Sequence, residues 1–331
     1  MDRETPLWAR LDEPGEYREL ARTRLEHVVR IGVPMLLCSQ IQRSGGTLFS
    51  RLFDGHPEVH AHPHELKIGP KDRWPKLDLD APGTWFEALY EESAAGHLLT
   101  GWSKPGLKET DVDVFPFLFL PGIQERLFYA CVGQRAIERQ RDVLDCYFTA
   151  YFNAWVDNQN LYTGPKKLLT SFATRTSLHA KSVERFFRDY PDGWLVTIVR
   201  EPRAWYASAS RHRAQYEDLE AAMELWRGSA VAAVDARQRY ANRAIVLTYE
   251  ELVRDTEGTM RRVAGQVGLT WDPILLVPTF NSRPVRANSS DPVQSYGVLA
   301  DRAEAWRDVL DTTTAARVEE LADDLYEQAG A

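Results

Sequence analysis

The stretch PMLLCSQIQRSGGTLFSRLFDGHPEV, residues 34–59, decides the fold class. It opens with a short apolar run, PMLLCS, which is too brief for a helix and is typical of a buried strand. A turn with two glycines follows, and residues 47–54 resume the apolar spacing of a helix. A buried strand that enters a helix through a glycine-rich turn indicates the first unit of an α/β protein.

The rest of the chain repeats this alternation of strands and helices. Strands are predicted at residues 168–173, 194–199 and 244–248, and helices at 134–160, 178–188, 216–240, 256–267 and from Pro202 onward. Strands separated by helices imply a central, mostly parallel sheet flanked by helices. No linker is rich enough in Gly, Ser or Pro to divide the chain. Residues 1–331 are therefore predicted to form one domain, with an N-terminal helix at about 16–31 and a helical and loop insertion at about 74–160.

Composition excludes several classes of protein. The 331 residues include 40 Lys plus Arg and 48 Asp plus Glu, a net charge of −8 that argues against a nucleic-acid binder. The longest uncharged apolar stretch, residues 114–123, is shorter than the roughly 20 residues that a membrane-spanning helix needs. The three cysteines, Cys38, Cys131 and Cys146, form no CxxC pair, and the first thirty residues have no apolar leader segment. These features predict reduced thiols and a cytoplasmic protein.

The turn after the first strand has the chemistry of an anion site. Gly45 and Gly46 let the backbone approach a ligand, and the start of the helix presents unpaired N–H groups. Ser44 and Thr47 add hydroxyl donors, and Arg43 adds a planar guanidinium. An ordinary tight turn with a surface arginine has the same sequence, so both interpretations stay open. No lysine follows Gly46, as the nucleoside-triphosphate loop GxxxxGK[ST] would require.

A second anion site is predicted after the strand at residues 194–199. Arg200 follows this strand directly, and Ser208 lies eight residues later in the next helix. Ligands of open parallel sheets bind beyond the carboxyl ends of the strands. Two anion sites after two strands imply one ligand with two separated phosphate-like groups. Magnesium-dependent phosphoryl transfer instead favours an acidic residue at such a strand end.

Together these segments resemble the sulfotransferase family, which transfers sulfuryl groups from 3′-phosphoadenosine 5′-phosphosulfate (PAPS). The matching segments are RSGGT at 43–47 before a helix that ends in HP at 56–57, Arg200 with Ser208, IVLTYEELV at 245–253, and the tail segments PTFN at 278–281 and NSS at 288–290. The resemblance spans about residues 33–310 and points to the bacterial branch. It implies a P-loop-like sulfotransferase fold, PAPS as donor, adenosine 3′,5′-bisphosphate (PAP) as product, and no metal.

The resemblance also implies roles for individual residues. Those that correspond to 5′-phosphosulfate contacts are Arg43, Ser44, Gly45, Gly46 and Thr47, and those that correspond to 3′-phosphate contacts are Arg200 and Ser208. Tyr249 resembles a residue that borders the adenine, and Arg286 and Ser289 lie in the late loop that wraps the cofactor in the family. Gly46 stands where the family has its first threonine, so one hydroxyl contact is absent and weaker cofactor binding is expected.

The acceptor hydroxyl needs a base to remove its proton, and the segment VHAHPHE offers several. Glu65 lies six residues after Val59, a spacing that resembles the carboxylate base of the glycan-modifying branch. His64 is the alternative base because an imidazole titrates near neutral pH, and His60 and His62 are further candidates. The alternating histidines would face one way in a strand, and a metal site there is not expected.

The resemblance implies an enzyme that sulfates a hydroxyl of a small-molecule, lipid or sugar acceptor. The insertion at about 74–160 is expected to form the acceptor pocket, and the net acidity disfavours a highly anionic glycan. Two other classes stay open. A P-loop kinase-like phosphotransferase would share the anion loop, and a catalytically silent nucleotide-binding protein would bind PAP and transfer nothing.

Overall fold

The computed structural model describes residues 14–91, 118–285 and 296–330, with side-chain placement left open at a few positions in the first helix. The chain divides into two compact units. The first contains residues 1–32, 67–71 and 75–164, and the second contains residues 33–66, 72–74 and 165–331. The predicted insertion at 74–160 falls almost entirely in the first unit. That the whole chain acts as one domain stays a prediction.

A five-stranded parallel sheet forms the centre of the second unit. Its strands are β1 (Met35–Cys38), β2 (Val59–Glu65), β3 (Leu168–Phe172), β4 (Trp194–Val199) and β5 (Ala244–Thr248). Their order across the sheet is β2-β3-β1-β4-β5, and every neighbouring pair is parallel. The predicted parallel sheet is therefore confirmed. The strands predicted at 194–199 and 244–248 have the predicted bounds.

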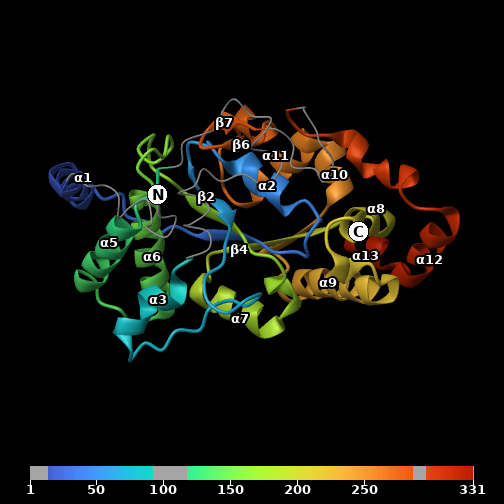
Figure 1. Ribbon diagram of the computed structural model, residues 1–331, viewed down its shortest axis with the longest axis horizontal. Helices are drawn as coiled ribbons and strands as arrows, with labels where there is room; N and C mark the ends of the chain where they lie inside the picture. Colours follow the sequence, from blue (N-terminus) through green and yellow to red (C-terminus); the bar gives the residue numbers. More distant parts are fainter. Residues whose placement is uncertain (1–13, 92–117, 286–295, 331) are drawn as a thin grey trace, which may run out of the picture. The chain divides into compact units, whose positions relative to one another are not determined.

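Helices cover both faces of this sheet, which explains why β1, β4 and β5 are nearly continuous apolar runs. The helices of the second unit are α2 (Gly46–Phe53), α7 (Ala180–Asp189), α8 (Pro202–Ser210), α9 (Leu219–Arg239), α10 (Tyr249–Arg254), α11 (Thr256–Gln266), α12 (Thr312–Ala322) and α13 (Leu325–Gly330). In Figure 1, α2, α10 and α11 lie on one side of the sheet, and α7 and α9 lie on the other. A short antiparallel pair, β6 (Thr279–Phe280) with β7 (Arg283–Pro284), completes this unit.

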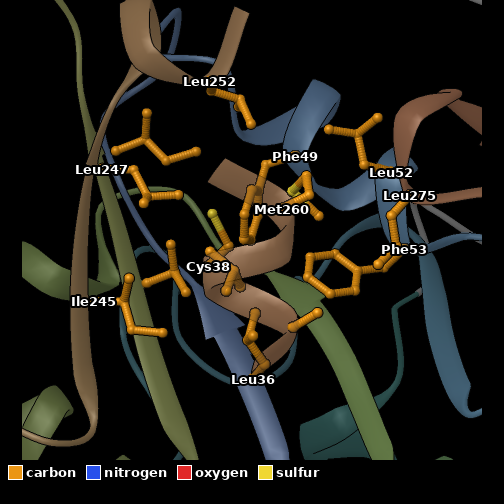
Figure 2. Packing of buried hydrophobic residues seen from close by; sticks show 14 of the residues in the cluster. Leu36, Cys38, Phe49, Leu52, Phe53, Ile245, Leu247, Leu252, Met260 and Leu275 are labelled. Carbon is orange, nitrogen blue, oxygen red and sulfur yellow. The ribbon is translucent and has the colours of Figure 1, made fainter. Parts of the chain in front are cut away.

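The largest apolar cluster joins α2, α10 and α11 to the strands. Figure 2 shows Phe49 and Phe53 of α2 packed with Leu36 and Cys38 of β1 and with Leu247 of β5. All five side chains except Cys38 are large hydrocarbons, and all five are buried. This packing fixes α2 against the sheet and so fixes the turn that leads into it.

The first unit is helical, and its helix bounds differ from the predictions. Its helices are α1 (Pro14–Glu26), α3 (Trp85–Leu89), α5 (Pro121–Gly133) and α6 (Gln140–Ala154). The helix predicted at 16–31 ends at Glu26, because the Val29 amide donates to the Asn153 side chain and the Ile31 amide donates to Thr149. The helix predicted at 134–160 is shorter because Asp142 caps its start at Gln140.

A disulfide between Cys131 of α5 and Cys146 of α6 corrects the prediction of reduced thiols. The two helices pack side by side, and their Cα atoms at these positions lie 5.5 Å apart, within the range of a disulfide. The spacing of 15 residues carries no sequence signature of this contact. Cys38 alone is a free thiol, buried in β1. Among the described helices, none is both long enough and apolar enough to cross a bilayer.

Candidate active site

The ends of the five strands place the candidate residues at one edge of the sheet. Because the strands are all parallel, their carboxyl ends share this edge. Glu65 ends β2, Thr174 follows β3, and Arg43 lies in the turn after β1. Arg200 follows β4, and Tyr249 follows β5. Open α/β sheets bind ligands beyond this edge.

The turn after β1 has the backbone shape of an anion-binding loop. Arg43 and Gly45 have φ values of 71° and 97°, in the left-handed region, and α2 begins at Gly46. A Cβ at position 45 would lie 2.6 Å from the ring of Tyr249, so both conformation and space require glycine there. The first amides of α2 have no partner within the helix and can bind an anion.

The two anion motifs of the sequence meet in the structure. Nε of Arg43 donates a hydrogen bond to Oγ of Ser208 over 3.0 Å, although 165 residues separate the two. The hydroxyl residues of the loop lie beside this contact in sequence. Ser44 is buried, and Thr47 is half-buried in the first turn of α2. The start of α2 and the end of α8 therefore contribute to a single site.

Arg200 ties the loop after β1 to a C-terminal segment. Its Nη1 donates to the carbonyl oxygen of Arg43 over 3.0 Å, and its Nη2 donates to that of Arg302 over 3.2 Å. Its guanidinium carbon lies 4.3 Å from the ring centre of Tyr249, a cation–π distance. Nε1 of Trp226 donates to the carbonyl of Arg200 over 2.9 Å. Nε of Arg200 is buried and has no hydrogen-bond partner among the described residues.

Three arginines gather around Tyr249. Burial raises the pKa of the Tyr249 hydroxyl, the positive charges of Arg200, Arg302 and Arg43 oppose that rise, and the carboxylate of Glu250 adds to it. Three guanidinium groups and one carboxylate thus act on this ring, a local excess of positive charge in an acidic chain. The sequence did not indicate Arg302, because it lies in a short 3-10 helix without a recognisable motif. A bordering role for Tyr249 beside an adenine stays a prediction.

The carboxylate of Glu65 is held at the end of β2. Its Oε1 accepts a hydrogen bond from Oγ1 of Thr174, and its Oε2 accepts none from the residues that the structure describes. His64 is buried, and its Nδ1 lies 2.8 Å from the carbonyl oxygen of Glu65. Because a carbonyl only accepts, Nδ1 carries the proton of this contact. Oε2 of Glu65 is the carboxylate oxygen that the bond from Thr174 does not use.

The histidines of β2 lie at different distances from the carboxyl end of the strand. The rings of His62 and His64 lie 4.3 Å apart, on one side of the strand as their alternation predicts. The pairing of β2 with β3 shifts register between Ala61 and Glu65. His60 pairs with Leu169 near the beginning of the strand, five residues before Glu65. This position leaves His60 well away from the carboxyl edge.

His60 is expected to make stability depend on pH. Burial, together with the charge of Lys166, lowers the pKa of His60 to about 3, while an unfolded histidine titrates near 6.5. Below pH 6.5 the unfolded state binds the extra proton, so stability falls as pH falls, by about 1.4 kcal/mol per unit toward pH 3. Urea unfolding of wild type and His60→Gln at pH 7, 6, 5 and 4 should show a flatter profile for the variant. Parallel profiles would contradict this assignment.

A second arginine at a strand end was missed by the sequence reasoning. Arg175 follows β3 with a φ of 61°, its Nε donates to Oε1 of Gln42 over 2.9 Å, and its Nη2 donates to the hydroxyl of Tyr216 over 3.0 Å. The same hydroxyl donates to Gln42 over 3.1 Å. Arg175 thus holds the side chain of Gln42, the residue before Arg43, by a hydrogen bond. The rule that located Arg200, a cation directly after a buried strand, does not reach Arg175, because Ala173 and Thr174 stand between β3 and Arg175.

The predictions for Arg286 and Ser289 lie outside the described residues. The same is true of residues 92–117 in the segment that was predicted to form the acceptor pocket.

The fold is that of an α/β protein whose first strand enters its first helix through a turn with two glycines. A model of the Sulfotransferase family matches residues 40–273 of this chain. The match covers most of the chain, so the protein belongs to the sulfotransferase family, and sulfuryl transfer is its supported reaction class. Family membership favours this reaction over the kinase-like alternative.

Several solved structures are similar to this chain at low sequence identity. The sulfotransferase domain of the Synechococcus PCC 7002 olefin synthase is 17% identical, with 88% of this chain and 95% of that chain covered and a TM-score of 0.50. The sulfotransferase domain of the curacin biosynthetic pathway is 15% identical, with 88% and 97% covered and a TM-score of 0.47. A mouse sulfotransferase complexed with PAP is 10% identical, with 92% and 87% covered and a TM-score of 0.39. No curated protein matches the chain.

Proposed function

We propose that the protein is a PAPS-dependent sulfotransferase that sulfates a hydroxyl of a small-molecule, lipid or sugar acceptor by in-line displacement. The contact between Arg43 and Ser208 carries this proposal, because it joins the two anion motifs in one site. Family membership supports the transfer. The order and spacing of the motifs support PAPS as the donor.

The described residues fit a nucleotide with two anionic ends. Arg43, Ser44, Thr47 and the first amides of α2 suit a 5′-phosphosulfate, and Arg200 with Ser208 suits a 3′-phosphate. The buried Nε of Arg200, which has no hydrogen-bond partner among the described residues, supports the proposal that an anion binds there. A buried donor without an acceptor costs about 1–3 kcal/mol, which a bound phosphate oxygen would offset.

Proton removal is assigned to Glu65. Thr174 holds Oε1, so Oε2 is oriented to take the proton of the acceptor hydroxyl while that oxygen attacks. PAPS supplies the activated sulfuryl group, whose bond to the 5′-phosphate oxygen breaks as the new O–S bond forms. Arg43 stabilises the negative charge that this oxygen keeps. The proton ends on Glu65, and His64 is the alternative acceptor.

The charge of the chain bears on the class of acceptor. The net charge of −8 disfavours a strongly anionic glycan. A cytoplasmic location stays a prediction. The cysteine argument no longer supports it, because Cys131 and Cys146 are bonded to each other.

Thermal and chemical unfolding with added PAP is the test of this function. PAP at a hundred times its dissociation constant should add about 2.7 kcal/mol of stability. Incubation with PAPS and a panel of phenols, alcohols and sugars should release PAP. Stabilisation by ATP with Mg²⁺ but not by PAP would favour a phosphotransferase. Binding of PAP without turnover of any acceptor would favour a silent nucleotide-binding protein.

A further inference from the structure

The side chain of Gln40 occupies the space that Gly46 leaves in the anion loop. A Cβ at position 46 would lie 1.8 Å from Nε2 of Gln40 and 2.7 Å from its Cδ. Gly46, unlike Gly45, has no positive φ, so its backbone would accept a side chain. The glycine at 46 is therefore explained by the presence of Gln40 rather than by backbone conformation.

Cys38 sets the orientation of this amide. Sγ of Cys38 lies 3.1 Å from Oε1 of Gln40, and the thiol is buried in the cluster beneath α2 (Figure 2). Burial raises the pKa of the Cys38 thiol far above its ordinary value, so its hydrogen is present at neutral pH. A thiol that donates needs an acceptor, which places Oε1 toward Cys38 and Nε2 toward the loop.

The amide nitrogen faces the loop without a partner. Gln40 is 2% exposed, and its backbone carbonyl accepts from the amide of Arg175 over 2.9 Å. Within the described residues, Nε2 of Gln40 donates no hydrogen bond. A buried amide aimed at the start of a helix, beside the guanidinium-bearing turn, is a preformed donor for an anionic oxygen.

We propose that Nε2 of Gln40 binds an oxygen of the 5′ anionic group, in place of the hydroxyl that a threonine at position 46 would supply. This inference rests on the proposed function, because it needs a nucleotide with an anionic 5′ end. The amide replaces the contact that the sequence indicated as absent. Gln40 is thus a binding residue, and weaker cofactor binding no longer follows from Gly46.

The test is a double-variant cycle read with two nucleotides. Gln40→Ala removes the donor, Gly46→Ala displaces it, and the double variant combines both changes. Calorimetric titration with PAP should show about tenfold or greater loss of affinity in each single variant, because a hydrogen bond to a charged group is lost. The double variant should bind as weakly as a single one, since both changes remove one interaction. Adenosine 3′-monophosphate, which lacks the 5′ group, should bind all four proteins equally.

Gln40→Glu gives a variant of almost unchanged shape in which a carboxylate replaces the donor. It should weaken PAP binding more than Gln40→Ala does, and the unfolding midpoint without ligand reports whether each variant is folded. The inference is overturned if wild type binds PAP and these variants bind it equally well, or if adenosine 3′-monophosphate loses as much affinity. It is also overturned if the affinity loss of the double variant equals the product of the two single losses, because the two changes would then act on separate interactions. Failure of wild type to bind PAP would overturn the proposed function itself.

Discussion

Replacing Arg200 by alanine is expected to remove almost all of the stabilisation that PAP gives. The buried Nε of Arg200 faces no acceptor among the described residues, and the 3′-phosphate is its proposed partner. Truncating one member of a buried charged pair costs about 2–5 kcal/mol, which corresponds to a rise of about 30- to 5,000-fold in the dissociation constant. At a PAP concentration that adds about 2.7 kcal/mol to wild type, a hundredfold rise would leave the variant a gain of only about 0.4 kcal/mol.

Arg200→Ala also changes the stability of the unliganded protein. The stabilisation by PAP is therefore measured against the unfolding free energy of the same variant without PAP. The variant loses the bonds to the carbonyls of Arg43 and Arg302 and the contact with Tyr249. Arg203→Ala is the matched control, because Arg203 pairs with Glu201 and stacks on Trp306. The control should keep the full PAP effect. Equal PAP stabilisation of wild type and Arg200→Ala would remove Arg200 from the site.

The sheet was the most predictable part of the molecule. Residues 194–199 and 244–248 are largely apolar runs of strand length, the pattern of a fully buried parallel strand. Helix ends were less predictable, because side chains distant in sequence set them. The residues after Glu26 leave the helix to bond Asn153 and Thr149, and no local sequence pattern indicates those partners.

The candidate site also has parts that the sequence predicts and parts that it does not. The rule that parallel strands end at one edge predicts that Arg43 and Arg200 lie close together, and Ser208 contacts Arg43 from helix α8. Gln40 could not be assigned from sequence, because its role depends on the space above Gly46 and on the thiol of Cys38. The disulfide was missed for a related reason. Only the packing of α5 on α6 brings Cys131 to Cys146.

Glu65→Gln is expected to lower kcat by about 10²–10⁴-fold, the usual contribution of a positioned general base. Glutamine keeps the size of the side chain and can still accept from Oγ1 of Thr174. It cannot take a proton from the acceptor hydroxyl. The dissociation constant for PAP should stay unchanged, because Glu65 is assigned to the acceptor and not to the nucleotide. Single-turnover kinetics with saturating PAPS, together with PAP titration, separate these two effects.

Two further variants distinguish a base from a residue that only shapes the site. Thr174→Val removes the hydroxyl that orients Oε1, so it should lower kcat by a smaller factor than Glu65→Gln. His64→Gln should leave kcat within a few-fold of wild type, since an amide can replace the bond from Nδ1 to the Glu65 carbonyl. The opposite pattern, with full turnover in Glu65→Gln and a large loss in His64→Gln, would move the base to the imidazole. Proton removal would then pass through Nε2 of His64, because Nδ1 already donates to the Glu65 carbonyl.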